Sequence, residues 1–189
     1  MSRFPELSKE TMNDAQRAVA AEIAAGPRGG IRGPFLPLLH NPELARRLQA
    51  VGEYLRYQTG LPDPLVELAI LVTARHFTCQ YEWYAHERLA RKAGLAEDVI
   101  AAIAAGGTPA AMTDDERTVH RFARESLGGG EPSEAAFAAA RDRFGLDKVL
   151  SLLALCGYYS TLALVLNTAQ LALPDGAPPP LANPSASRP

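Results

Sequence analysis

The chain has 189 residues, of which 47% are hydrophobic and 21% are charged, and its formal net charge is -2. This length fits one domain with a core large enough to fold without disulfide bonds, so residues 1–174 are expected to form a single domain. Acidic and basic residues are interspersed, without the basic patch that nucleic acid or an anionic membrane would select, so neither partner is expected.

Helix signals begin near the N-terminus. A first helix is expected over residues 8–25, ending at Gly26, because glycine readily takes the left-handed conformation that closes a helix. Asn41 followed by Pro42 is typical of an N-cap and a first helical position, so a second helix is expected from there. Residues at helical spacing predict its buried stripe: Leu44, Leu48, Val51 and Leu55.

The segment from Asp63 to Gly94 is helical in pattern but longer than a mean helix. It predicts either one long helix or two helices joined near residues 77–80, and we favour the break, with Thr78 as the second N-cap. Cys79 would then lie in the first turn of the second helix, where the helix dipole favours a thiolate. A merely buried thiol would instead be inert.

The remaining helix signals complete an all-α prediction of about eight helices. Period-two alternation is absent, so no sheet is expected. Residues 175–189 are rich in proline and poor in apolar residues, which predicts a disordered tail. The further expected helices are residues 96–105, Thr113 through Arg124 with a Thr113–Glu116 capping box, Ser133 to Phe144, and an apolar helix from Asp147.

The apolar helix raises the question of a membrane. Residues 149–173 carry no charge and are long enough to span a bilayer, but several Ser, Thr, Asn and Gln residues interrupt them. A helix that is apolar all round also suits the centre of a helical oligomer, and we favour this buried position. A polar N-terminal start and two cysteines without metal-binding spacing, Cys79 and Cys156, predict a cytoplasmic protein.

Residues 76–86, HFTCQYEWYAH, concentrate reactive side chains. Cys79, Glu82 and His86 follow at i, i+3 and i+7, so they share one helical face, and a carboxylate one turn from an imidazole can orient it as a general acid or base. The rings of Tyr81, Trp83 and Tyr84 flank this face. The alternative is an ordinary surface or interface pair with a buried cysteine.

Glu67 lies in the apolar run LVELAILV, where an unpaired carboxylate would be costly to bury, so His86 or Arg75 is expected to be its partner. His76, Glu82 and His86 do not match the helical two-histidine motif of metalloenzymes, so no metal is expected.

Residues 67–95 resemble the central motif of the carboxymuconolactone decarboxylase family, which shares its fold with alkyl hydroperoxide reductase D. The segments GPFLPLLHNPELARRLQAVGEYLRYQTGL and GYYSTLALVLN extend the resemblance over most of residues 25–170. In the peroxidase branch the motif is a glutamate, a Cys-x-x-Cys pair and a histidine. Glu67, Cys79 and His86 match it, whereas Glu82 replaces the second cysteine.

The resemblance therefore implies the decarboxylase branch: a lyase of aromatic degradation that needs no cofactor and acts on a small lactone or oxo-acid. It implies a homotrimer or homohexamer, with His86, Glu82, Glu67 and Cys79 as site residues. We expect Arg75, Arg32 and Tyr57 to hold the substrate, with Tyr81 and Trp83 flanking it. Two rivals stay open: a Cys79-dependent peroxidase or redox protein, and a non-catalytic ligand-binding oligomer.

Overall fold

The computed structural model describes residues 2–27 and 29–182, and the regular secondary structure of this part of the chain is entirely helical, without strands. The all-α prediction is confirmed. The described residues form nine α-helices and one short 3₁₀ helix: α1 (Asp14–Ala25), α2 (Phe35–Leu38), α3 (Pro42–Tyr57), α4 (Asp63–His76), α5 (Gln80–Ala93), α6 (Glu97–Ala104), α7 (Asp114–Gly129), α8 (Glu134–Phe144), α9 (Leu146–Ala169) and η1 (Pro174–Gly176).

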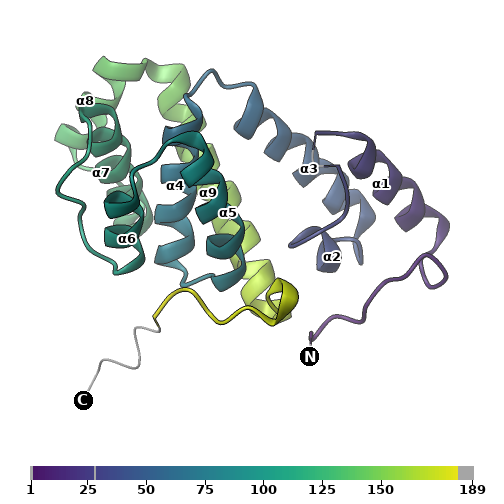
Figure 1. Cartoon of the computed structure of the whole chain (residues 1–189). Helices are drawn as coiled ribbons and strands as arrows, with labels where there is room; N and C mark the ends of the chain where they lie inside the picture. Colours follow the sequence, from purple (N-terminus) through teal and green to yellow (C-terminus); the bar gives the residue numbers. More distant parts are fainter. Residues whose placement is uncertain (1, 28, 183–189) are drawn as a thin grey trace.

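Helices α4 and α9 form the centre of the bundle. Helix α4 packs against α5, α7 and α9, while α9 also packs against α3 and α8. Figure 1 shows α1, α2 and α3 on one side of this centre and α6, α7 and α8 on the other. Because it is enclosed on several sides, α4 is apolar almost all round, and Leu68, Ala69, Ile70 and Leu71 have no exposed surface.

The capping signals explain where most helices begin. The Thr113–Glu116 capping box is present at α7, and the Asn41 side chain accepts a hydrogen bond from the Leu44 amide. Helix α1 begins later than expected, at Asp14, because Asn13 and Gln16 form a capping box there and residues 8–11 make a turn instead.

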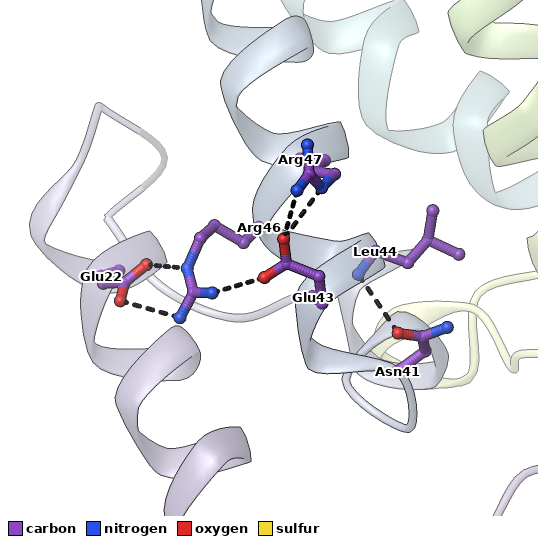
Figure 2. A network of polar contacts seen from close by, with 6 residues as sticks. All are labelled: Glu22, Asn41, Glu43, Leu44, Arg46 and Arg47. Carbon is purple, nitrogen blue, oxygen red and sulfur yellow. Dashed lines mark hydrogen bonds and ion pairs between the residues drawn. The ribbon is translucent and has the colours of Figure 1, made fainter.

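Exposed charged residues connect α1 to α3. The guanidinium of Arg46 in α3 lies between Glu22 of α1, at 2.8 Å, and Glu43 of its own helix, at 2.6 Å (Figure 2). Figure 2 also shows Arg47 reaching the same Glu43 carboxylate. The side chains of Arg46, Glu22 and Glu43 are each about half exposed and that of Arg47 is 76% exposed, so this network orients α1 more than it stabilises it.

The expected buried stripe of α3 is wrong at two positions, since Leu44 is 44% exposed and Val51 is 47% exposed. The face that α3 buries instead contains Ala45, Gln49, Gly52 and Leu55. Gly52 is required there because the Tyr158 hydroxyl of α9 lies where a Cβ atom would be. This close approach of α3 to α9 explains why the buried face is small and partly polar.

The expected break in the long helical segment is confirmed between α4 and α5. Thr78, however, is not the N-cap: it adopts a left-handed conformation with φ of 47°, and Cys79 caps α5 without a side-chain hydrogen bond. The Cys79 amide donates to the Ala74 carbonyl, which closes α4 and turns the chain into α5. The two helices therefore pack side by side, which brings His86 back towards Glu67.

Within the described residues, only α9 is long and apolar enough to cross a membrane, with a mean hydropathy of 2.0 over its most apolar window. Such a helix is also typical of a protein core. More than half of this window is buried against neighbouring helices, as the buried-helix prediction expects.

The expected disorder after residue 174 is wrong for residues 175–182. Leu181 is 4% exposed and packs in the core, and its backbone exchanges two hydrogen bonds of 2.9 Å with the Gln80 side chain. The burial of Leu181 and its hydrogen bonds to the Gln80 side chain thus order a segment whose composition predicts disorder. Residues 183–189 lie outside the described part.

Candidate active site

A cavity of about 500 Å³ lies between α3, α5 and α9, under the loop that precedes α2. This volume is in the range of small-molecule sites. The chemically relevant side chains around it are Arg32, Arg56, Tyr57, Tyr81, Glu82, Tyr84, His86, Arg88 and Tyr159.

Two carboxylates flank the imidazole of His86. Its Nδ1 lies 2.7 Å from Glu67 Oε2, and its Nε2 lies 3.4 Å from Glu82 Oε2. The His86 Nδ1–H donates to Glu67, which fixes the tautomer and the plane of the ring. Nε2 is then the nitrogen available for chemistry. All three side chains are at most 8% exposed, so this group is shielded from bulk water.

Arg56 supplies the positive charge of this cluster. Its Nη2 lies 3.5 Å from Glu67 Oε1, on the carboxylate oxygen that His86 does not use. With only 14% of the Arg56 side chain exposed, the attraction is screened less than in a surface pair. Glu67 is therefore held from two sides, by the α3 guanidinium and the α5 imidazole.

Tyr159 of α9 also lines the cavity, next to the imidazole of His86. Its ring meets His86 edge to face, with 5.0 Å between the centroids, and it is 3% exposed. Burial raises the pKa of the Tyr159 phenol well above its ordinary value. The phenol therefore stays protonated and is able to donate a hydrogen bond to a ligand oxygen.

The rest of the lining combines cations with aromatic rings. Arg88 donates to the Tyr84 hydroxyl at 2.6 Å and lies over the ring of that tyrosine. Arg32 lines the cavity without an ion-pair partner in the described part of the chain. An anionic ligand would meet these guanidinium groups before reaching His86.

The chain was compared with known proteins by sequence and by structure. A model of the carboxymuconolactone decarboxylase family matches residues 42–125. Over these residues the chain is similar to that family. The match spans α3 to α7 and includes Glu67, Glu82 and His86, so the resemblance seen in the sequence is confirmed. Among curated proteins, none matches this chain.

The structure is similar to the alkylhydroperoxidase AhpD core of an uncharacterized peroxidase-related protein from Ralstonia eutropha JMP134. The TM-score is 0.73 at 21% sequence identity, over 92% of this chain and 93% of that chain. The AhpD-like fold prediction is therefore confirmed. At this identity the similarity concerns the fold alone.

Most of the site residues expected from the sequence meet in one place. Glu82, His86, Arg32, Tyr57 and Tyr81 line the cavity, and Glu67 is bonded to His86 beneath it. Of the two expected partners for Glu67, His86 is the correct one. The group contains no set of three or more side chains placed to hold a metal ion, nor does the rest of the described chain.

Three expected residues lie elsewhere. Arg75, near the C-terminal end of α4, lines a different cavity. Trp83 is 1% exposed and lies in the main hydrophobic core, because it projects from the face of α5 opposite the cavity. Cys79 has no exposed surface and packs with Ala163 and Leu166 of α9.

The thiol of Cys79 is not activated by its position before α5. Burial raises its pKa to about 12, a larger effect than the backbone hydrogen bonds that lower it. Of the two possibilities that the sequence left open for Cys79, the structure favours the inert buried thiol over the thiolate.

Three site residues, Arg56, Arg88 and Tyr159, are missing from the residues expected. All three lie outside the HFTCQYEWYAH segment, and Arg56 and Tyr159 are on helices that reach the cavity only in the folded chain. A tyrosine pair within an otherwise apolar α9 was a usable signal for Tyr159. Nothing local distinguishes Arg56 from the exposed arginines of α3.

Proposed function

We propose that this protein is an acid-base enzyme that needs no cofactor and acts on a small anionic lactone or oxo-acid, with His86 as the proton-transferring group. The observation that carries the proposal is the imidazole held between Glu67 and Glu82 at the wall of a ligand-sized cavity. Buried acid-base groups with fixed orientation are what proton transfer to carbon requires.

The reaction class that suits this arrangement is decarboxylation or a related proton transfer. Loss of carbon dioxide from a carboxylated lactone or a β-oxo acid leaves the bond's electron pair in an enolate. His86 Nε2 would give a proton to the enolate carbon and regain one from solvent after the product leaves. Glu67 would hold the ring through Nδ1 throughout.

In this proposal, side chains other than His86 bind the oxygen atoms of the substrate. The protonated Tyr159 phenol would donate to the carbonyl oxygen on which negative charge develops. Arg32 and Arg88 would hold a carboxylate at the cavity mouth. The family model and the fold agree with this assignment but leave the reaction and the substrate open.

The Cys79 peroxidase has less support. A peroxide must reach a thiolate, whereas Cys79 has no exposed surface and burial raises its pKa to about 12. Cys156 is also buried, and both cysteines are free. If no substrate turns over, the remaining hypothesis is a non-catalytic ligand-binding protein.

The test is a panel of γ-carboxylated lactones, β-oxo acids and organic hydroperoxides against wild type and variants. We expect His86→Ala to lower turnover of one lactone or oxo-acid by about a hundredfold or more, with helical content unchanged by circular dichroism. The matched control is His40→Ala, because His40 is exposed and does not line the cavity. Full activity of His86→Ala would overturn the proposal.

A second readout separates proton transfer from binding. In D₂O the product should carry one deuterium at the enolate carbon that accepts the proton, and Glu82→Gln should lower kcat more than it raises KM. Turnover of hydroperoxides alone, abolished by Cys79→Ser, would support the peroxidase instead.

We also propose that α9 mediates self-association with a second copy of this chain. Its solvent-facing side is uncharged from Leu150 to the end of the helix, and Leu146, Leu150 and Leu164 are each more than half exposed. The small residues Ala154 and Gly157 lie on the same exposed side, which would let two helices approach closely. A trimer or hexamer built on this surface would bury a stripe that a soluble monomer would expose.

A further inference from the structure

A second cavity, of about 300 Å³, lies between the C-terminal end of α4, the turn after α6, and α7. It shares no lining residue with the cavity at His86. The proposed proton-transfer reaction uses none of its side chains. Its chemistry therefore calls for a separate explanation.

The lining of this cavity is basic. Four of its side chains are Arg75, His76, His120 and Arg124, and among the described residues no aspartate or glutamate lines it. Neither arginine has a carboxylate within ion-pair distance in the described part of the chain. In a chain whose net charge is -2, two guanidinium groups at one hollow without a counter-charge among the described residues are a feature to explain.

The two guanidinium groups are only partly used by the protein. Arg75 Nη1 donates to Thr78 Oγ1 at 3.2 Å and to the Ala182 carbonyl at 3.3 Å. Arg124 Nη1 donates to Thr108 Oγ1 at 3.2 Å and to the Gly107 carbonyl at 3.3 Å. These bonds position each side chain at a helix end, an ordinary structural role.

These hydrogen bonds use only some of the N–H donors of each arginine. Each arginine has five N–H groups, and the side of the group formed by Nε and Nη2 makes no hydrogen bond to the described residues in either case. This is an edge that binds a carboxylate or phosphate through two parallel hydrogen bonds.

His120 adds a buried donor to the same hollow. It is 3% exposed, lines the cavity, and its ring makes no hydrogen bond to the residues that the structure describes. Because the ring lines the cavity and has no protein partner in the described chain, a ligand or solvent molecule in the cavity is its natural hydrogen-bond partner. Burial, together with the nearby Arg124 charge, lowers the pKa of His120 to about 4, so the neutral ring has one N–H to donate at neutral pH.

The remaining walls are apolar and come from Val72, Ile103 and Leu127. We infer that this cavity binds a small organic carboxylate, with the carboxylate between Arg75, Arg124 and His120 and the apolar part against these three side chains. The volume is at the lower end of small-molecule sites, which fits an acid of about ten non-hydrogen atoms.

The probes that test this inference are benzoate, benzamide and inorganic phosphate. Benzamide has nearly the shape of benzoate without its charge, and phosphate has the charge without an apolar part. We expect benzoate to shift the ring resonances of His120 saturably in long-range ¹H–¹⁵N spectra, and to bind at least about tenfold more tightly than either other probe. The His120 signals are assigned by their loss in His120→Asn.

Variants decide which cavity binds. Arg124→Gln should weaken benzoate binding at least about tenfold, and Arg124→Lys should weaken it less, because lysine keeps the charge but loses the paired donors. Arg121→Gln is the matched control, since it removes the same charge from an exposed position of α7 outside the cavity. Arg32→Gln, in the cavity at His86, should leave the His120 shifts unchanged.

Each other result counts against the inference. Equal binding of benzamide would show an apolar site, and equal binding of phosphate would show that the organic part is not recognised. Binding that survives Arg124→Gln but is lost in Arg32→Gln would place the anion at His86. Because Arg32→Gln and Arg124→Gln act on separate cavities, failure here leaves the proposed proton transfer untouched.

Discussion

Glu67 Oε2 and His86 Nδ1 lie 2.7 Å apart although the two residues are 19 positions apart in the sequence. The break at Thr78 makes this contact possible, because it folds α5 back along α4. A carboxylate in the most buried helix of the bundle is thus paired with an imidazole at the edge of a cavity.

Removing this carboxylate should cost stability. Glu67→Ala leaves the Arg56 guanidinium and the His86 ring without their buried partner, so we expect the free energy of unfolding to fall by about 3 kcal/mol. Glu67→Gln should cost less, because its amide oxygen still accepts from Nδ1. Urea denaturation measures both. The control is Glu22→Ala in the exposed network of Figure 2, which should leave the midpoint nearly unchanged.

The Tyr159 hydroxyl should matter for turnover more than for folding. Tyr159→Phe removes the donor proposed for the developing oxyanion, so we expect kcat to fall by about a hundredfold with a smaller change in KM. Tyr158→Phe is the matched control, because Tyr158 packs on Gly52 and does not line the cavity. Similar kinetics for the two variants would remove Tyr159 from the mechanism.

Cys79 should be unreactive in the folded protein. Because burial raises the pKa of the Cys79 thiol to about 12 and that of the Cys156 thiol to about 11, a disulfide reagent at pH 8 should label neither within minutes. Both thiols should react after unfolding in urea. Rapid labelling of one thiol in native Cys156→Ala, which retains only Cys79, would instead revive the peroxidase reading.

His120 should make stability depend on pH below neutrality. Its pKa falls from 6.5 to about 4 on folding, chiefly because burial disfavours the charged ring. Between these values the unfolded chain binds one proton more than the folded chain, so the free energy of unfolding falls as the pH is lowered from 6.5 to 4. In His120→Gln this decline should be shallower, whereas exposed His40→Gln should follow wild type. An identical decline in all three proteins would contradict the assignment.

The proposed association through α9 is tested by adding charge to its exposed face. Leu150, at 66% exposure, is the most exposed large apolar residue of that helix. Leu150→Glu should shift the mass measured by light scattering towards the monomer, while Leu44→Glu on α3 should not. A monomeric wild type would rule out the assembly.

Local chemistry explains why much of the fold could be predicted from the sequence. The Thr113–Glu116 capping box and the Asn41 N-cap fixed helix starts because their hydrogen bonds span only three residues. The four-residue helix α2 and the anchoring of Leu181 could not be predicted in this way, since both depend on packing against distant segments. Composition alone suggested disorder near Leu181.

In the candidate site, too, the contacts within one helix could be predicted from the sequence, whereas most contacts between distant segments could not. Glu82 and His86 could be paired from helical spacing, and the burial of Glu67 demanded a partner. The sequence could not indicate which arginine would complete the cluster: Arg75 was expected, yet Arg56 supplies the charge because α3, not the end of α4, borders the cavity.

The absence of a side chain at Gly52 has a consequence for substrate choice. Tyr158 fills the space that a Cβ atom would take, and this contact sets how closely α3 approaches α9. Arg56 and Tyr57 follow one turn later on α3, and Tyr159 follows Tyr158 on α9, so the same spacing fixes the width of the cavity. A methyl group at position 52 would push α3 away from α9. The cavity would become wider, and different molecules would fit it, although the methyl group itself would not contact them.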